Sequence, residues 1–440
     1  MSVCIHWFRR DLRLEDNTAL FHALQSGVPV LLVFILDSHI LSELTVPGVL
    51  TLDKRLIFIC DQLVVLQKKL RAFGSDLKVF YGDPVEVWQK IAGQYDIQSV
   101  YANHDYESYA ISRDEQVYRF LSARKIAFHT YKDQCIFEKL EIAKDDGSPY
   151  TVFTPYSKKW LNTLSEKHLL EFDISGLTSR FFRPETLSEI PDLESIGFKY
   201  VKVHFPPCNL DEYTLTRYAD ARDFPAKDGT SRIGVHLRFG TISIRSCVRK
   251  ALQLGASVFL KELIWREFYM MILASFPHVV SRSFKEEYDR IVWKNDERLF
   301  DLWCAGETGY PIVDAGMREL NATGYMHNRV RMIAASFLTK HLLTDWRWGE
   351  AYFARKLLDF ELASNNGGWQ WAAGSGCDAA PYFRVFNPEI QAKKFDPEGI
   401  YIRQWVPEIG SSGYPEPVVE HRFARQRAID AYKLALKGVV

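Results

Sequence analysis

The chain has 440 residues, of which 47% are hydrophobic and 25% are charged, the composition of an ordinary globular protein. One hydrophobic core seldom organises a chain of this length, so we expect two domains. No apolar run reaches the ~18–20 residues of a membrane-spanning helix, and the N-terminus has no basic-then-apolar leader. We therefore expect a soluble, cytoplasmic protein with no membrane partner.

The net charge is zero, but it is unevenly distributed. Residues 1–200 carry a net charge of −4 and residues 201–440 a net charge of +4. This asymmetry does not identify a nucleic-acid binder, but it makes the C-terminal half the better candidate. The seven cysteines are scattered, with no CxxC pair, which argues against a disulfide framework and against a metal site.

Strand and helix patterns alternate over the first 132 residues. The expected strands are 3–8, 29–36, 77–81, 98–102 and 126–131, and the expected helices are 17–25, 51–73, 84–91 and 111–124. Such alternation predicts an α/β domain with a parallel, doubly wound, Rossmann-like sheet. Arg9-Arg10-Asp11 follows the first strand where a glycine-rich phosphate loop would stand, so the standard dinucleotide fingerprint is absent.

The rest of the chain has a different pattern. Residues 133–200 are polar and weakly periodic, which indicates an interdomain connector. From 201 to 440 helical spacing predominates and predicts a larger all-α domain. The expected helices are 213–221, 243–253, 256–275, 311–323, 326–341, 349–361 and 421–436.

Two motifs in the helical half combine charged and aromatic side chains. The segment 230–234 places hydroxyls, a guanidinium and backbone N–H groups before a helix, which suits a phosphate; the alternative is an ordinary helix N-cap with a surface arginine. Glu262, Trp265, Arg266 and Tyr269 share one helix face and could bind a base by its edge and its ring. The alternative for this face is a surface ion pair beside a half-buried tryptophan.

Two further motifs have the same character. Asn328 and Met332 share a face flanked by Arg329 and Arg331, which fits a flat aromatic ligand, although Met332 could simply fill the core. In segment 365–371, two tryptophans bracket Gln370 after a Gly-Gly pair that permits close backbone approach; packing alone would also explain them. Together the four motifs predict a polar, aromatic and anionic ligand.

Three of these segments resemble the photolyase/cryptochrome family. They are Glu-Leu-Ile-Trp-Arg-Glu-Phe-Tyr at 262–269, Met-His-Asn-Arg-Val-Arg-Met at 326–332 and Asn-Asn-Gly-Gly-Trp-Gln-Trp at 365–371. The resemblance extends from Trp7 to about Trp405 and is strongest to class I cyclobutane pyrimidine dimer photolyases. It implies an antenna-binding domain at 1–132, a connector at 133–200 and an FAD- and DNA-binding domain at 201–440.

The resemblance implies a role for each matching residue. The residues expected to bind FAD are Tyr218, Thr230, Ser231, Arg232, Ile233, Gly234, Arg266, Asn328, Arg331, Asp359, Phe360, Glu361 and Asn365, the last of which would face the flavin N5. Gly234 replaces a serine common in the family. The residues expected to bind the lesion or DNA are Arg222, Glu262, Trp265, Arg266, Asn328, Arg329, Met332, Trp371, Arg384 and Gln391. Trp369, Trp346 and Trp293 match a relay that photoreduces FAD; with Glu262 and Asn365 they form the expected catalytic set.

The implied activity is that of a carbon–carbon lyase. Excited reduced FAD would donate an electron to a flipped-out cyclobutane dimer in damaged DNA, and the enzyme is expected to be a monomer. Asn328, where (6-4) photolyases have a second histidine, argues against that chemistry. Glu107 is a candidate contact for a second chromophore, which could be folate, deazaflavin, a second flavin or absent. Two alternatives are a blue-light receptor with the same flavin but no repair, and a flavin redox enzyme for small molecules.

Overall fold

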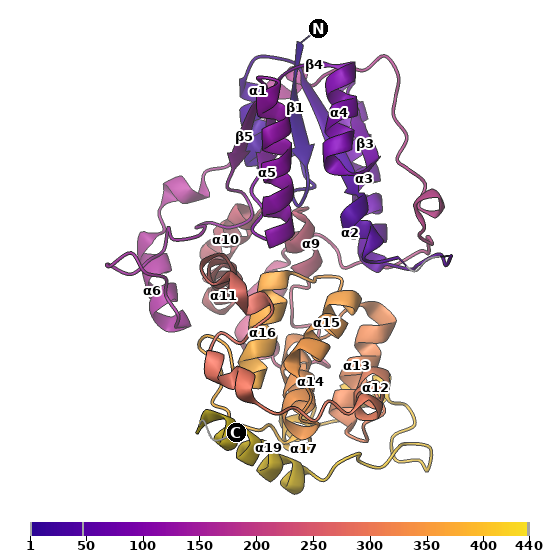
Figure 1. The fold of residues 1–440 in the computed structure, drawn as a ribbon, viewed down its shortest axis with the longest axis vertical. Coiled ribbons are helices and arrows are strands. Elements are labelled where there is room, and N and C mark those ends of the chain that lie inside the picture. Colours follow the sequence, from indigo (N-terminus) through magenta and orange to yellow (C-terminus); the bar gives the residue numbers. More distant parts are fainter. Residues whose placement is uncertain (1, 46–47, 438–440) are drawn as a thin grey trace. The chain divides into compact units, whose positions relative to one another are not determined.

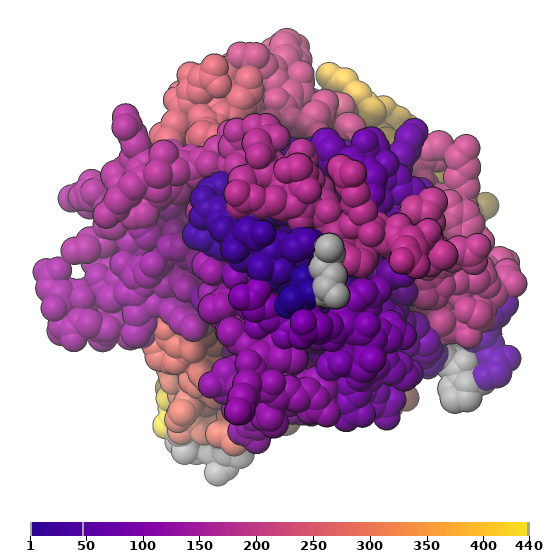
Figure 2. Space-filling model, turned by 90° about the horizontal axis from the view of Figure 1, so that it is seen from above, coloured from indigo at the N-terminus to yellow at the C-terminus, as the bar shows by residue number. Residues whose placement is uncertain are grey.

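A computed structural model describes residues 2–45 and 48–437, and all candidate site residues lie within these ranges. The chain forms two compact units that interleave along the sequence. Unit 1 comprises Met1–Glu138, Leu164–Asn209 and Arg232–Lys250, and unit 2 comprises Lys139–Thr163, Leu210–Ser231 and Ala251–Val440. The continuous domains expected at 1–132 and 201–440, with their connector, remain a prediction. Residues coloured indigo to magenta, from the first half of the chain, make up most of the face seen in Figure 2.

Unit 1 is built on a five-stranded parallel sheet with the strand order β3-β2-β1-β4-β5. The strands are β1 (Ser2–Phe8), β2 (Val30–Asp37), β3 (Leu77–Gly82), β4 (Asp96–Asn103) and β5 (Ala127–Tyr131). In β1, Trp7 pairs with Val33 of β2 and Ile5 pairs with Val100 of β4. The central strands are buried almost throughout, as expected for a sheet covered on both faces. The predicted doubly wound α/β architecture is confirmed.

Helices cover this sheet (Figure 1). They are α1 (Thr18–Gln25), α2 (Ser38–Ser42), α3 (Lys54–Ala72), α4 (Pro84–Gln94) and α5 (Ser108–Ala123), with α9 (Gly234–Phe239) and most of α10 (Ile244–Gln253) also in this unit. The side chains of Asn17, Asp53 and Asp83 cap α1, α3 and α4 by accepting first-turn N–H groups. The four helices predicted between the strands are thus present, with shifted ends.

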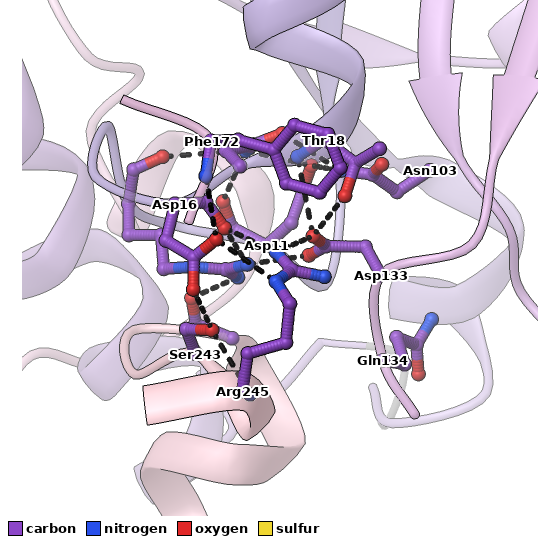
Figure 3. A network of polar contacts seen from close by, with 12 residues as sticks. Asp11, Asp16, Thr18, Asn103, Asp133, Gln134, Phe172, Ser243 and Arg245 are labelled. Atoms are coloured by element: carbon purple, nitrogen blue, oxygen red, sulfur yellow. Dashed lines mark hydrogen bonds and ion pairs between the residues drawn. The ribbon is translucent and has the colours of Figure 1, made fainter. Parts of the chain in front are cut away.

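A buried ionic network holds the loop after β1 to the start of α10 (Figure 3). Arg245 donates to Asp16 Oδ1 and to Asp133 Oδ1, each at 2.8 Å, and Arg13 donates to Asp133 Oδ2 at 2.7 Å. Burial by itself raises the pKa of Asp133, but Arg13 and Arg245 outweigh it and lower this pKa to about 2. Asp133 is therefore ionised, and its charge is matched by two buried arginines.

Unit 2 is helical, and its described residues contain no named strand, so the predicted larger all-α domain is confirmed. Its helices are α6 (Phe153–Thr163), α7 (Glu212–Thr216), α8 (Tyr218–Ala221), α11 (Ser257–Ser275), α12 (Glu297–Ala305), α13 (Pro311–Thr323), α14 (Asn328–Ser336), α15 (Trp346–Lys356), α16 (Leu362–Ala373), α17 (Pro388–Phe395), α18 (Ile400–Trp405) and α19 (His421–Leu436). A π-helical turn, Phe337–His341, continues α14. Among the described residues, no helix combines the length and apolar character needed to cross a membrane.

Several predicted element boundaries were wrong. The helix expected at 213–221 is broken into α7 and α8, and the helix expected at 349–361 is α15, which begins after the N-cap Asp345 and ends at Lys356. Residues 359–361 therefore form a turn between α15 and α16. The polar connector contains α6. Segment 365–371 lies inside α16, whose paired asparagines and glycines have low helix propensity.

Candidate functional site

Unit 2 encloses a cavity of about 390 Å³. Its walls come from α11, α14, α15, α16 and the turn between the last two helices. The lining side chains predicted from sequence are Arg222, Glu262, Trp265, Arg266, Asn328, Arg331, Met332, Asp359, Phe360, Glu361, Asn365, Trp369 and Trp371. Tyr269, Ala335, Phe353, Leu357, Ser364 and Gly368 complete the wall. Residues that are far apart in sequence thus meet around one space.

The face of α11 directed at the cavity carries Glu262, Trp265, Arg266 and Tyr269, as their helical spacing predicts. The Trp265 indole stacks on Phe153 of α6, with centroids 3.7 Å apart and planes at 8°. Phe153 was missed, because it lies in the segment interpreted as a connector. Its ring fixes the orientation of Trp265, which also lines the cavity.

The close approach of α11 to α16 depends on Gly367. A Cβ atom at Gly367 would lie 2.2 Å from the Tyr269 ring, so only glycine fits there. At Gly368, by contrast, a Cβ atom would meet nothing within 4 Å. The first glycine of the pair therefore permits helix packing, and the second lines the cavity.

Two ion pairs lie on the cavity wall. Arg331 donates from Nη2 to both carboxylate oxygens of Asp359, at 3.1 and 2.9 Å, and from Nε to the Met326 carbonyl at 2.7 Å. Arg266 Nη2 donates to Glu361 Oε1 at 2.9 Å, and the other oxygen of Glu361 accepts from Ser364. Because each half-buried arginine has a carboxylate partner, the wall presents fixed polar groups to a ligand.

Asn365 is oriented by a residue that sequence reasoning missed. Its Nδ2 donates to the Glu350 side chain at 2.7 Å and to the Glu350 carbonyl at 3.1 Å. The amide carbonyl Oδ1 is therefore the atom left to accept a hydrogen bond from a ligand. Burial raises the pKa of Glu350. The sequence spacing could have identified Glu350, because it follows Trp346 by four positions and so lies on the same helix face.

Asn328 and Met332 line the cavity together, one helical turn apart on α14. Glu262 accepts a hydrogen bond from Arg222 Nη1, and both residues lie on the cavity wall. Arg329 points to Asp223, with its Nη2 at 2.7 Å from Oδ1, and does not appear on that wall. The exposed Arg384 and the half-buried Gln391, on α17, also lie outside it.

The three tryptophans of the expected relay belong to one aromatic region. Trp369 lines the cavity and is buried, Trp346 is buried, and half-buried Trp293 packs on the hydrophobic cluster that contains both. A further indole, Trp303, makes an edge contact with Trp369 at 6.0 Å. Gly349 permits this packing, since a Cβ there would lie 2.1 Å from Trp369. Trp369 therefore has a neighbouring indole that the relay prediction did not include.

Other predicted site residues lie away from the cavity wall. Tyr218 has the Arg222 guanidinium 5.4 Å above its ring. The segment 230–234 crosses the division between the units, with α9 beginning at Gly234, so its phosphate-binding role remains a prediction. In unit 1, Glu107 accepts from Arg10 at 3.0 Å and from Arg238 at 2.8 Å. A chromophore contact by Glu107 also remains a prediction.

The cavity fits a flavin. The paired arginines and carboxylates can bind the polar edge of an isoalloxazine ring, the Asn365 carbonyl can accept from its N5–H, and Trp369 and Met332 offer apolar contact. The described residues contain no cluster of His, Cys, Asp or Glu suited to a metal ion. An α/β unit together with a helical unit that carries a cavity of this lining is consistent with the class of flavoproteins.

Comparisons with known proteins agree with this class. Residues 4–172 match the DNA photolyase family, and residues 259–412 match the FAD binding domain of DNA photolyase. The deoxyribodipyrimidine photo-lyase of Vibrio cholerae is 39% identical, over 98% of this chain and 99% of its own. The chain belongs to the DNA photolyase family. It is thus an enzyme of the photolyase class, and FAD is its cofactor.

Solved structures show the same relationship. A bacterial class III photolyase from Agrobacterium tumefaciens is 33% identical with a TM-score of 0.88, covering 99% of this chain and 98% of that one. An archaeal photolyase from Sulfolobus tokodaii, solved with two FAD molecules, is 34% identical with a TM-score of 0.79 and covers 98% and 100%. A Synechocystis cryptochrome is 25% identical with a TM-score of 0.85 and covers 98% and 99%. These neighbours do not support assigning class I over other classes, which remains a prediction.

Proposed function

We propose that this photolyase splits cyclobutane pyrimidine dimers in DNA with the energy of light. One observation carries the proposal: the same 390 Å³ cavity is lined both by groups suited to a flavin and by groups suited to a pyrimidine dimer. Electron transfer between two bound partners requires that they lie close together, and a shared cavity supplies that proximity.

On the flavin side, Arg331 with Asp359 and Arg266 with Glu361 would hold the polar edge of FAD. The carbonyl of Asn365 would accept from N5–H. When bound, reduced FAD supplies the photoexcitable electron donor for this reaction. These residues bind and orient the cofactor; they need not change their covalent state.

On the lesion side, Trp265 and Trp371 would be the apolar walls and Met332 the floor. Glu262 and Asn328 can form hydrogen bonds with the polar edges of the two pyrimidines. Through its acid proton, the Glu262 side chain would donate a hydrogen bond to the dimer and so stabilise the negative charge that develops there, which is an electrostatic contribution to catalysis. An unstacked dimer would enter this pocket from the duplex, a step for which photolyases are a standing example.

Arg222, Arg329, Arg384 and Gln391 would contact the DNA backbone. Arginine contacts with phosphates give affinity that does not depend on sequence and that falls as salt rises. The proposal includes a cytoplasmic monomer that acts on damaged DNA.

The test compares lesions. Reduced, FAD-loaded protein is mixed with one oligonucleotide containing a cyclobutane thymine dimer and with another containing a (6-4) photoproduct, in blue light and in darkness. We expect light-dependent loss of the cyclobutane dimer alone. Loss of the (6-4) product instead would overturn the choice of substrate.

The second candidate is a blue-light receptor without repair activity. The similarity to the Synechocystis cryptochrome favours it, since the fold is common to both groups. The presence of both pocket tryptophans and of Glu262 at the cavity wall favours repair. FAD that is photoreduced normally in a protein that repairs neither lesion would make the receptor the better account.

A further inference from the structure

Four charged side chains beside the cavity form a chain of alternating sign, here called the ion-pair chain. Arg329 Nη2 lies 2.7 Å from Asp223 Oδ1, and the same oxygen lies 4.0 Å from Arg222 Nε. Arg222 Nη1 in turn donates to Glu262 Oε1. Asp223 thus lies between two arginines that would bind DNA, and the chain ends at the carboxylate that would bind the lesion.

The backbone fixes the centre of the ion-pair chain. The N–H of Arg222 donates to the Tyr218 carbonyl at 3.0 Å at the end of α8, and the N–H of Phe224 donates to the Ala221 carbonyl at 3.1 Å. The polypeptide backbone then turns back toward α8. It approaches so closely that a Cβ atom at Gly229 would lie 2.5 Å from the Cβ atom of Ala221. This tight turn holds Asp223 next to both guanidinium groups.

The side chain of Arg329 is turned inward. Its guanidinium lies 4.4 Å from the centre of the Phe395 ring, and Nη1 reaches the Met332 sulfur at 3.7 Å. Its Nε is buried and, among the described residues, has no hydrogen-bond partner. A phosphate could engage this arginine fully only if the side chain left Asp223 and turned outward.

We propose that the ion-pair chain competes with DNA phosphates for Arg222 and Arg329. This inference rests on the proposed function, because it assigns Asp223 a role in the same DNA-binding surface. Asp223 opposes the binding of any DNA, because a backbone phosphate can bind Arg329 only after the ion pair between Arg329 and Asp223 has broken. Glu262 opposes binding differently: a dimer that enters the cavity can replace Arg222 as its hydrogen-bond partner, whereas undamaged DNA offers no such group.

This difference between Asp223 and Glu262 allows the protein to discriminate dimer-containing DNA from undamaged DNA. Undamaged DNA separates both arginines from their carboxylates and leaves Glu262 without a new partner. DNA containing a dimer also separates them but supplies that partner. Glu262 is therefore a specificity-determining residue before it takes part in repair, and Asp223 is a positioning residue that lowers overall affinity.

The test measures the binding of undamaged and dimer-containing duplexes at one fixed salt concentration. Asp223→Asn should tighten the binding of both by about fivefold, the size of one partly exposed charge interaction. Arg329→Gln should weaken both. Glu262→Gln should tighten undamaged DNA and weaken dimer-containing DNA, so that the ratio of the two affinities falls.

The matched control is Asp220→Asn, which removes an exposed carboxylate from α8 and should change neither affinity. FAD content and melting temperature establish that each variant is folded. If Asp223→Asn weakens both duplexes as Arg329→Gln does, Asp223 merely orients Arg329 and the competition is overturned. Dimer repair is assayed on the same wild-type protein, and DNA binding without repair would contradict the proposed function. The competition is tested separately, by whether Asp223→Asn raises or lowers the affinity for DNA.

Discussion

The Asn365 amide donates from Nδ2 to the Glu350 carboxylate at 2.7 Å. This bond fixes which end of the amide is available to the cofactor. A reduced flavin has an N5–H donor, whereas an oxidised flavin has an acceptor at N5, so a carbonyl directed at N5 favours the reduced form. If Asn365 faces the flavin N5 as proposed, Glu350 would act on the flavin through Asn365.

Glu350→Leu should lower the reduction potential of bound FAD, because the amide can then rotate and offer its N–H group to oxidised flavin. One neutral hydrogen bond of ~1 kcal/mol corresponds to about 20 mV for a two-electron couple and about 45 mV for a one-electron couple. Redox titration of the purified holoprotein measures this shift. Glu350→Gln keeps an oxygen acceptor for Nδ2 and is the control; equal potentials in the Leu and Gln variants would contradict the account.

Gly367→Ala should destabilise the protein by about 1–3 kcal/mol, because its Cβ atom would overlap the Tyr269 ring. Gly368→Ala in the same helix meets nothing within 4 Å and should stabilise it by about 0.5–1 kcal/mol. Urea unfolding of the FAD-free proteins compares the two without ligand effects. The packing argument fails if both variants have the same midpoint.

Trp293→Phe should slow the photoreduction of oxidised FAD while leaving repair by chemically reduced protein intact. The reason is that Trp293 is the partly exposed member of the aromatic region that leads to Trp369. Time-resolved absorption after a blue flash measures the rate. Trp303→Phe tests whether electrons reach Trp369 through Trp303 instead. If Trp303→Phe slows photoreduction and Trp293→Phe does not, the relay runs through Trp303.

Asp133→Asn should lower the free energy of unfolding at pH 7 by ~3–5 kcal/mol, because Arg13 and Arg245 would lose a shared buried partner. The folded-state pKa of about 2 lies below the ordinary value of ~3.9, so this stabilisation is present above pH ~4 and is lost as pH falls toward 2. The difference in the free energy of unfolding between the wild type and Asp133→Asn should therefore become smaller at acidic pH. Denaturant unfolding at a series of pH values tests this, with exposed Asp96→Asn as the control; a deficit that does not change with pH would contradict it.

The sequence predicted much of the fold because the signals were local. Apolar runs such as 29–36 specified buried strands, and the spacing of Glu262, Trp265, Arg266 and Tyr269 specified one helix face. The helix α16 was not predicted, because its stability comes from tertiary packing: Gly367 lowers helix propensity but lets Tyr269 approach. Propensity alone could not reveal that contact.

The supporting residues of the site were harder to predict. Glu350, Asp223 and Phe153 act by touching Asn365, Arg329 and Trp265, which lie between 15 and 112 positions away along the chain. Only the folded chain brings these pairs together. Motif spacing identified the residues on the cavity wall, but not the residues that hold them in place.

The most direct measurement is the quantum yield of dimer loss in a single turnover. Wild-type protein with fully reduced FAD is bound to an oligonucleotide containing one cyclobutane thymine dimer, and repaired strands are counted after blue light and after an equal time in darkness. The account predicts repair in light only, with a lower yield in Glu262→Gln although FAD remains bound. An intact dimer after illumination of bound, FAD-reduced wild-type protein would contradict it.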